Sequence, residues 1–191
     1  THEYLEIADG VVLTDEQQKV VDFVVPFLGT PAYQPTLIHG VTGSGKTEVY
    51  KRLIKTAITN NKSVVLLLPE VTLALQFQML LGLQLPGICV MGFHSATKIS
   101  EKRVLWERVC RAEPTLIIGV HLPVLLPLAN LGLLIIDEEH EQGFCEKKHP
   151  KINSKQVALM RAHFYKIPIV LGSATPSLNS LYNVSHHDWK L

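Results

Sequence analysis

The chain has 191 residues and is 47% hydrophobic, which is enough for one domain with a sizeable core. Its 18 basic and 17 acidic residues leave a net charge of +1, so nothing global indicates nucleic-acid binding, and a DNA site would need a local patch. Its three cysteines form no C-x-x-C pair, which argues against a zinc ribbon and a disulfide framework. No apolar run approaches the roughly 20 residues of a membrane span, and no signal peptide is visible, which argues against a membrane protein and a secreted one.

Short apolar runs alternate along the chain with stretches that have a helical pattern. Residues 1–12 are expected to be a tail or the end of a linker, followed by one domain at 13–191. The predicted strands are 36–39, 64–68, 88–90, 116–118, 133–136 and 169–171. The predicted helices are 16–27, 47–59, 73–81, 101–112 and 155–164. This alternation predicts an α/β fold with a mostly parallel, doubly wound sheet and helices on both faces, whose ligands bind beyond the carboxyl ends of the strands.

A glycine-rich loop follows the first predicted strand and reads G-x-x-x-x-G-K-T. Its glycines let the backbone fold tightly, so that N–H groups and the start of the next helix can face phosphate oxygens. We expect Lys46 to reach the β- and γ-phosphates of ATP, and the Thr47 hydroxyl to bind Mg²⁺. The strand and helix around the loop argue against a chance match. The nucleotide-binding segment is expected to comprise Gly40, Val41, Thr42, Gly43, Ser44, Gly45, Lys46, Thr47 and Glu48.

An acidic cluster, Asp137-Glu138-Glu139-His140, follows the apolar run at 133–136. A strand that ends in paired carboxylates is the other half of a P-loop ATPase site, where Asp137 would hold Mg²⁺ and Glu138 would polarise the attacking water. His140 could bridge the γ-phosphate site to a neighbouring loop, because imidazole both donates and accepts hydrogen bonds. The other histidines are expected at the surface or hydrogen-bonded in the core. A solvated acidic turn is the alternative, and the phosphate loop argues against it.

The acidic cluster and the later stretch at 172–177, GSATPS, resemble the first motor lobe of superfamily 2 DNA helicases. A fuller series resembles the PriA family of primosomal helicases, which act in bacterial replication restart. That series is GVTGSGKTEVY, LLLPEVTLALQ, FHSATKISEKRVLWERV, NLGLLIIDEEH and LGSATPSLNSLY. The similarity runs in order over about 13–182, and it implies a RecA-like P-loop lobe.

The resemblance implies further site residues. Gln17 would read adenine through its amide, the alternative being a solvated helix residue. Segments that meet the DNA strand would include Pro69, Glu70, His94 and Ser95. The motif that couples ATP hydrolysis to DNA movement would include Ser173, Ala174 and Thr175, with His140 as its partner on the ATP side. Alternatively, Ser173 and Thr175 simply cap the following helix.

Two stretches depart from the family pattern. Before the acidic strand the family usually has a G-T-R-S-A-like stretch, whereas this chain has GVHLP at 119–123, without those hydroxyl and guanidinium donors. The loop at 144–156 has Phe144 as its only phenyl, phenol or indole ring, where the family has an aromatic-rich loop. Its basic residues are Lys147, Lys148, Lys151 and Lys155. Attraction of DNA phosphates and a flexible, solvated loop both stay open for this segment.

By resemblance, the full-length protein would be a DNA-dependent ATPase that uses ATP and Mg²⁺ for 3′→5′ translocation and unwinding at stalled forks. Its partners would be forked or single-stranded DNA, the single-strand binding protein and other primosome components, in the cytoplasm. A second motor lobe, an N-terminal DNA-binding region and a zinc module are expected outside this chain, so the fragment alone should turn over little ATP. The alternatives are another superfamily 2 translocase, RecG-like or repair-coupling, and a nucleotide-gated DNA-binding module that does not unwind.

Overall fold

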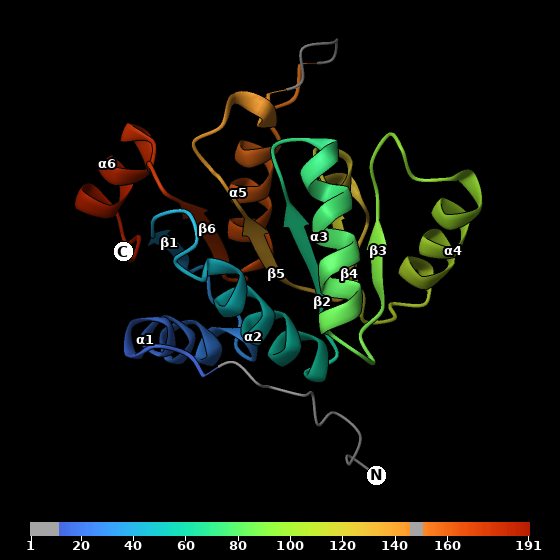
Figure 1. Ribbon diagram of the computed structural model, residues 1–191, viewed down its shortest axis with the longest axis horizontal. Coiled ribbons are helices and arrows are strands. Elements are labelled where there is room, and N and C mark those ends of the chain that lie inside the picture. Colours follow the sequence, from blue (N-terminus) through green and yellow to red (C-terminus); the bar gives the residue numbers. More distant parts are fainter. Residues whose placement is uncertain (1–11, 146–150) are drawn as a thin grey trace.

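Six parallel strands form one sheet in the computed structural model, which describes residues 12–145 and 151–191 (Figure 1). The strand order is β1-β6-β5-β2-β4-β3, and helices cover both faces. The strands are β1 Pro35–His39, β2 Ser63–Leu67, β3 Val90–Gly92, β4 Leu116–Gly119, β5 Leu131–Ile136 and β6 Ile169–Ser173. The predicted doubly wound α/β fold is therefore confirmed. The third strand begins later than predicted, because Ile88 still closes a turn and donates its N–H to the Leu85 carbonyl.

The helices lie between the strands as the sequence predicts, with two differences. They are α1 Asp15–Val24, α2 Lys46–Thr59, α3 Val71–Gln84, α4 Ile99–Cys110, α5 Ser154–Tyr165 and α6 Leu178–His186. Short 3₁₀ turns are η1 Val25–Leu28, η2 Leu122–Leu125 and η3 Gln142–Phe144. The helix predicted at 16–27 ends early and continues as η1, where Pro26 has no N–H to donate to the helix. Helix α6 was given no predicted range, although the capping alternative for Ser173 and Thr175 assumed a helix after them.

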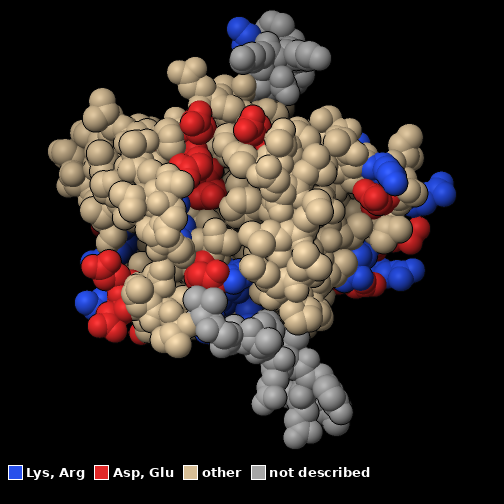
Figure 2. All heavy atoms as spheres, viewed as in Figure 1, with Lys and Arg blue, Asp and Glu red and all other residues tan. Residues whose placement is uncertain are grey.

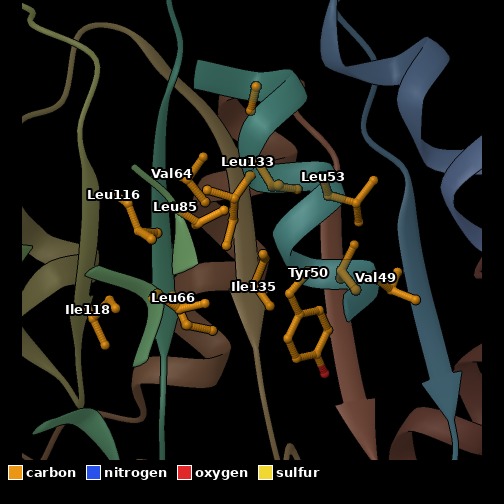
Figure 3. Packing of buried hydrophobic residues seen from close by; sticks show 14 of the residues in the cluster. Val49, Tyr50, Leu53, Val64, Leu66, Leu85, Leu116, Ile118, Leu133 and Ile135 are labelled. Atoms are coloured by element: carbon orange, nitrogen blue, oxygen red, sulfur yellow. The ribbon is translucent and has the colours of Figure 1, made fainter. Parts of the chain in front are cut away.

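Successive residues of each strand face opposite sides of the sheet. In β2, Val64 and Leu66 belong to a cluster with residues of α1, α2 and α3, whereas Val65 and Leu67 belong to a second cluster with residues of α4 and α5. Figure 3 shows the first cluster, in which α2 packs on the sheet through Leu53. Burial on both faces explains why the strand sequences are continuously apolar rather than alternating.

The strand order brings four chemically suggestive loops together. Strands β1, β6, β5 and β2 are neighbours and all run in the same direction, so their carboxyl ends lie at one edge of the sheet. The residues that follow these ends are the glycine-rich loop, the 174–177 stretch, the acidic cluster and Pro69. The site described below is built at this edge. Among the described residues, no helix is both long and apolar enough to cross a membrane.

Candidate nucleotide-binding site

The loop between β1 and α2 turns at two glycines. Gly43 and Gly45 have φ angles of 82° and 80°, in the left-handed region that side chains disfavour. Gly45 is the N-cap of α2 and brings no side-chain acceptor to the first N–H groups of the helix, which leaves them for another acceptor. The Gly40 N–H donates to the Ser173 carbonyl over 3.0 Å, which fixes the loop to the end of β6. This geometry suits an anion.

Lys46 folds back across the loop rather than extending into solvent. Its ammonium donates to the Gly40 carbonyl over 2.8 Å and lies 3.8 Å from a Glu138 carboxylate oxygen. The phosphate loop and the acidic cluster are therefore in contact, as both were predicted to serve one ATP site. Thr47 lies half-buried in the first turn of α2, and Glu48 forms an ion pair of 2.5 Å on the same helix. The other predicted loop residues are exposed: Val41, Thr42 and Ser44.

Gln17 lies against the phosphate loop although 27 residues separate it from Ser44. Its amide nitrogen donates to the Ser44 carbonyl over 2.8 Å. Its amide oxygen accepts from the Thr14 N–H over 2.9 Å, and the Thr14 hydroxyl accepts from the Gln17 N–H, which makes a capping box for α1. The Gln17 amide is thus held against the phosphate loop rather than extended into solvent, and its contact with adenine stays a prediction.

Asp137 follows β5 and is buried, with 6% of its surface exposed. Its Oδ1 accepts a hydrogen bond of 2.9 Å from the hydroxyl of Tyr50, which is fully buried on α2. Burial raises the pKa of Asp137, while the Tyr50 hydrogen bond opposes that rise. Burial, followed by the negative charge of Asp137, raises the pKa of Tyr50 well above its ordinary value, so the phenol stays protonated and donates.

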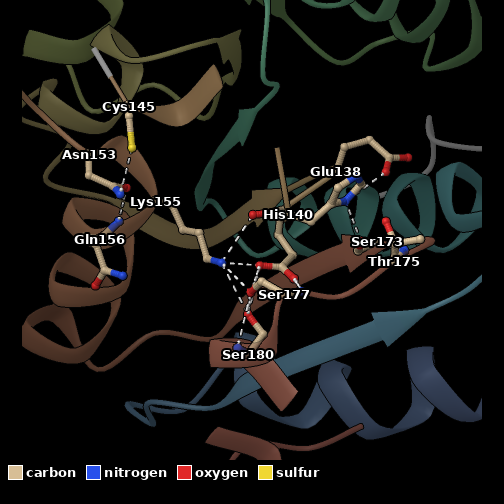
Figure 4. A network of polar contacts seen from close by, with 11 residues as sticks. Glu138, His140, Cys145, Asn153, Lys155, Gln156, Ser173, Thr175, Ser177 and Ser180 are labelled. Atoms are coloured by element: carbon tan, nitrogen blue, oxygen red, sulfur yellow. Dashed lines mark hydrogen bonds and ion pairs between the residues drawn. The ribbon is translucent and has the colours of Figure 1, made fainter. Parts of the chain in front are cut away.

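The backbone turns sharply after Asp137. Glu138 has a φ of 50°, a left-handed conformation that is uncommon outside glycine and is found at functional sites. The turn sends its side chains in different directions: the Glu138 carboxylate lies near Lys46, whereas His140 points toward Ser173 of β6 (Figure 4). His140 Nδ1 lies 2.7 Å from the Ser173 hydroxyl and 3.6 Å from Glu138. The predicted bridge between the acidic cluster and the 172–177 stretch is present as a contact.

Ser173 takes part in this bridge rather than in capping a helix. Its hydroxyl accepts from the Thr175 N–H over 3.0 Å, and its side chain is buried, whereas Ala174 is half-buried and Thr175 is exposed. The N-cap of α6 is Ser177, whose hydroxyl accepts from the Ser180 N–H. The alternative that Ser173 and Thr175 cap the following helix is therefore wrong.

Glu139 lies in the interior as the centre of a polar network. Its carboxylate accepts from the Lys155 ammonium, the Ser177 N–H (2.7 Å) and hydroxyl (3.1 Å), and the Ser180 hydroxyl (2.9 Å). Lys155, Ser177 and Ser180 converge in Figure 4 from α5 and the start of α6. Burial would raise the pKa of Glu139, but the hydrogen bond from Lys155 and those from Ser177 and Ser180 outweigh it and lower that pKa. This network ties the acidic turn to two helices.

The basic side chains expected at the 144–156 loop differ in position. Lys147 and Lys148 lie outside the described residues. Lys151 is exposed. Lys155 is buried in its ion pair with Glu139, so the prediction that it belongs to a solvated or DNA-attracting loop is wrong. Burying this ion pair is tolerated because further hydrogen bonds satisfy both charged groups.

The predicted DNA-facing residues lie at the same edge of the sheet, beyond β2 and β3. Pro69 is half-buried, and Glu70 and Ser95 are exposed. His94 is only 3% exposed, and neither ring nitrogen has a hydrogen-bond partner within 12–145 and 151–191, so it is not the satisfied core histidine that was expected. Burial, then the charge of Lys102, lowers its pKa. Figure 2 shows acidic side chains gathered in the hollow at this edge.

The residues at this edge fit magnesium and a triphosphate. The buried Asp137 carboxylate and the Thr47 hydroxyl are oxygen ligands, which Mg²⁺ prefers. The Lys46 ammonium contacts the Gly40 carbonyl and the Glu138 carboxylate. With a nucleotide bound, this ammonium would neutralise phosphate charge instead. The uncapped start of α2 supplies N–H donors.

The roles of three site residues were not predicted: those of Tyr50, Glu139 and Lys155. Tyr50 stands one helical turn after Lys46, on the same face of α2, and this spacing could have placed its hydroxyl near the phosphate loop. Lys155 shares helical spacing with Ala158 and Ala162, which are both fully buried. That spacing was the available sign that Lys155 faces inward. No local signal shows the position of Glu139.

The chain matches known helicases over most of its length. The family model described as DEAD/DEAH box helicase matches residues 14–184. The replication restart protein PriA of Bacillus subtilis (strain 168) is 38% identical over 172 residues, which cover 88% of this chain and 21% of that protein. PriA of Chlamydia muridarum is 39% identical over 176 residues, covering 90% of this chain and 23% of that protein. The predicted resemblance to PriA is confirmed, and the chain spans about a fifth of the length of these relatives.

Solved helicase structures share the fold. A structure of RecG bound to a three-way DNA junction superposes with a TM-score of 0.66 at 24% identity, covering 92% of this chain and 23% of RecG. The helicase MrfA gives a TM-score of 0.66 at 17% identity and covers 96% of this chain. These likenesses establish the fold, which is that of a helicase lobe. The phosphate loop and the acidic cluster form the candidate site of this lobe. The chain belongs to the DEAD/DEAH box helicase family.

Proposed function

We propose that residues 13–191 are the ATP-binding first motor lobe of a replication-restart DNA helicase. The observation that supports this most is the meeting of three predicted motifs at one edge of the sheet. Lys46 of the phosphate loop lies 3.8 Å from Glu138 of the acidic cluster, and His140 of that cluster lies 2.7 Å from Ser173. Contacts between these parts would let a change at the nucleotide reach the segments that face DNA.

Each side chain would have a distinct task in ATP hydrolysis. Lys46 neutralises phosphate charge, and Gln17 reads the adenine. Thr47 and Asp137 hold Mg²⁺, which when bound would screen the charge of the phosphates. Glu138 orients the attacking water, since it lies beside Lys46 and keeps 27% of its side chain exposed.

The contact between His140 and Ser173 would carry the coupling between nucleotide and DNA. A change in the position of Glu138 reaches His140 directly, because their side chains are 3.6 Å apart. From His140 it reaches the Ser173 hydroxyl, which also orients the Thr175 N–H. Residues beyond β2 and β3 would then meet the DNA strand, among them the half-buried Pro69 and the exposed Glu70 and Ser95.

The activity of the whole motor belongs to a longer protein. Its proposed substrate is a forked or single-stranded DNA, with 3′→5′ movement at stalled forks in the cytoplasm, and with the single-strand binding protein and primosome components as partners. The similarity to replication restart proteins of bacteria supports this assignment. ATP hydrolysis in such motors uses an arginine from a second lobe, worth about 10³–10⁵ in rate. We therefore expect the chain alone to bind nucleotide but to hydrolyse it slowly.

The test is the binding of a fluorescent ATP analogue in MgCl₂, followed by anisotropy, together with phosphate release in the presence of forked DNA. The chain should bind the analogue, Lys46→Ala should lose most of that affinity, and Lys19→Ala, an exposed lysine on α1, should bind as the parent does. Phosphate release should stay close to background. Equal binding by Lys46→Ala would contradict the assignment of the loop, and rapid turnover by the chain alone would contradict the need for a second lobe.

A nucleotide-gated DNA-binding module that does not unwind is the second candidate. The observation that favours it is the GVHLP stretch at 119–123, which lacks the hydroxyl and guanidinium donors usual in the family. Anisotropy of a labelled fork, with and without the ATP analogue, and strand separation by a longer protein that contains this lobe would distinguish the two. Binding without strand separation supports the module, and strand separation supports the motor.

A further inference from the structure

The hydroxyl of Tyr50 is the one polar atom of a side chain that otherwise packs as a hydrocarbon. The ring belongs to the apolar cluster between α2 and the sheet and has no exposed surface (Figure 3). Burying a hydroxyl in such a place is unfavourable unless it is hydrogen-bonded, so phenylalanine would serve packing alone equally well. The Tyr50 hydroxyl is hydrogen-bonded, because it donates to Asp137 Oδ1 over 2.9 Å. Within residues 12–145 and 151–191, the partner of this polar atom is therefore Asp137, the expected magnesium ligand.

The backbone of β6 leaves room for this pair. A Cβ added to Gly172 would lie 1.7 Å from the Tyr50 hydroxyl and 3.0 Å from Asp137 Oδ1. No atom fits at 1.7 Å, so any side chain at this position would displace the hydroxyl. Gly172 has no positive φ to explain the absence of a side chain. The hydrogen bond between Tyr50 of α2 and Asp137 after β5 therefore fits because β6 has no side chain at Gly172.

A hydrogen bond to one oxygen of a carboxylate fixes its orientation and leaves the lone pairs of the other oxygen available. Partners of this kind behind a metal ligand commonly change metal affinity by about 10–100-fold when they are removed. We propose that Tyr50 is a positioning residue, which holds Asp137 in the orientation that binds the magnesium ion of the nucleotide complex. Gly172 supports it by keeping the space of the hydroxyl free. This inference rests on the proposed ATP-binding function.

A purely structural hydroxyl would give a different result from a positioning one. Loss of a structural hydroxyl changes only the stability of the fold. Loss of a positioning hydroxyl changes the response of nucleotide binding to Mg²⁺, while binding without the metal stays the same. The variant Tyr50→Phe separates the two, because it keeps the ring and its packing and removes one oxygen atom.

The experiment measures the anisotropy of a fluorescent ATP analogue on the chain over a series of MgCl₂ concentrations, and again in EDTA. Tyr50→Phe should raise the Mg²⁺ concentration at the midpoint about 10–100-fold and leave the affinity in EDTA unchanged. Gly172→Ala, which retains the hydroxyl but displaces it, should show the same metal-specific loss. Tyr33→Phe, a half-buried tyrosine that precedes β1, is the matched control and should behave as the parent does.

A Mg²⁺ midpoint for Tyr50→Phe within about threefold of the parent overturns the positioning role, since removal of a true partner costs more. If Tyr50→Phe does not fold, Gly172→Ala decides by the same criterion. A parent chain that binds the analogue but shows no response to Mg²⁺ overturns this inference alone. A parent chain that does not bind the analogue at all overturns the proposed function, and this inference with it.

Discussion

The Glu139 carboxylate has no exposed side-chain surface, and its charge is balanced by one ammonium and three neutral donors. Taking two charges out of water is costly, and their attraction offsets this only when further hydrogen bonds satisfy both groups. Lys155 meets this condition, because its ammonium also lies 3.3 Å from the hydroxyls of Ser177 and Ser180. The network therefore holds only as a complete set.

We predict that Lys155→Met lowers the free energy of unfolding by about 3–5 kcal/mol, because it leaves the Glu139 charge buried and unpaired. Adding Glu139→Met in the same chain should recover much of this loss, since the double variant buries no charge. Lys151→Met, on an exposed lysine four residues earlier, is the control and should change stability by less than about 0.5 kcal/mol. Urea unfolding followed by circular dichroism measures all three. A double variant that is less stable than Lys155→Met would show that the ion pair is not the source of the effect.

The turn from β1 into α2 shows how a loop and a helix are joined through glycine. Gly43 and Gly45 both have left-handed backbones, but their surroundings differ. A Cβ at Gly43 meets nothing within 4 Å, whereas a Cβ at Gly45 would lie 2.4 Å from the Gln17 amide nitrogen. The Gln17 side chain is flexible and can move away, at the expense of its hydrogen bond to Ser44. Alanine at Gly43 therefore tests backbone strain alone, whereas alanine at Gly45 tests strain together with loss of the contact between α1 and the loop.

Alanine at three glycines should give a graded series of stabilities without nucleotide. Gly29→Ala should be neutral or gain about 0.4–1 kcal/mol, since φ is −110° and the site is open. Gly43→Ala should lose about 1–2 kcal/mol from the left-handed backbone alone. Gly45→Ala should lose a further 0.5–1.5 kcal/mol or so with the Gln17 hydrogen bond. Urea unfolding measures the series. Stability of Gly45→Ala equal to that of Gly29→Ala would rule out backbone strain as the reason for glycine here.

Most elements were predictable from the sequence because their apolar pattern follows their burial. Helix α6 was not among them: Leu178 is 86% exposed, Leu181 is 36% exposed, and the fully buried position on it is a serine, Ser180. At 9 residues it is also shorter than the roughly 11–18 residues over which a helical period is judged. The phosphate loop and acidic cluster were predictable as motifs. The pairs that Tyr50 forms with Asp137 and Lys155 with Glu139 were not, because contacts between elements depend on how the strands are ordered.

At the scale of the whole molecule, the sheet lies between two apolar clusters and contributes side chains to each. Strands β2, β4, β5 and β6 each give alternate residues to the two sides, so neither cluster keeps its strands if the other unfolds. Leu53 of α2 is fully buried on one side, and Leu105 of α4 is fully buried on the other. Both tryptophans lie on the Leu105 side: Trp106 on α4 itself, and Trp189 packed against its cluster. Their fluorescence therefore reports one side, whereas circular dichroism reports the whole fold.

We predict that the described domain unfolds as one unit. Leu53→Ala and Leu105→Ala should each lower the free energy of unfolding by about 2–5 kcal/mol, the cost of a cavity at a fully buried leucine. Because the sheet lies between the two sites, their effects should add within about 0.5 kcal/mol in the double variant. Leu83→Ala, at a leucine that is 82% exposed, is the control and should change little.

Urea unfolding of each variant, followed by tryptophan fluorescence and by circular dichroism, gives the measurement. A shared sheet requires the two signals to move together even for Leu53→Ala, whose cavity lies on the side without tryptophan. If Leu53→Ala shifted the circular dichroism transition and left the fluorescence transition in place, the two sides would unfold separately. In that case the phosphate-loop helix α2 could detach from the sheet while β5 and β6 kept their packing, and the ATP site would lose its geometry before the fold is lost.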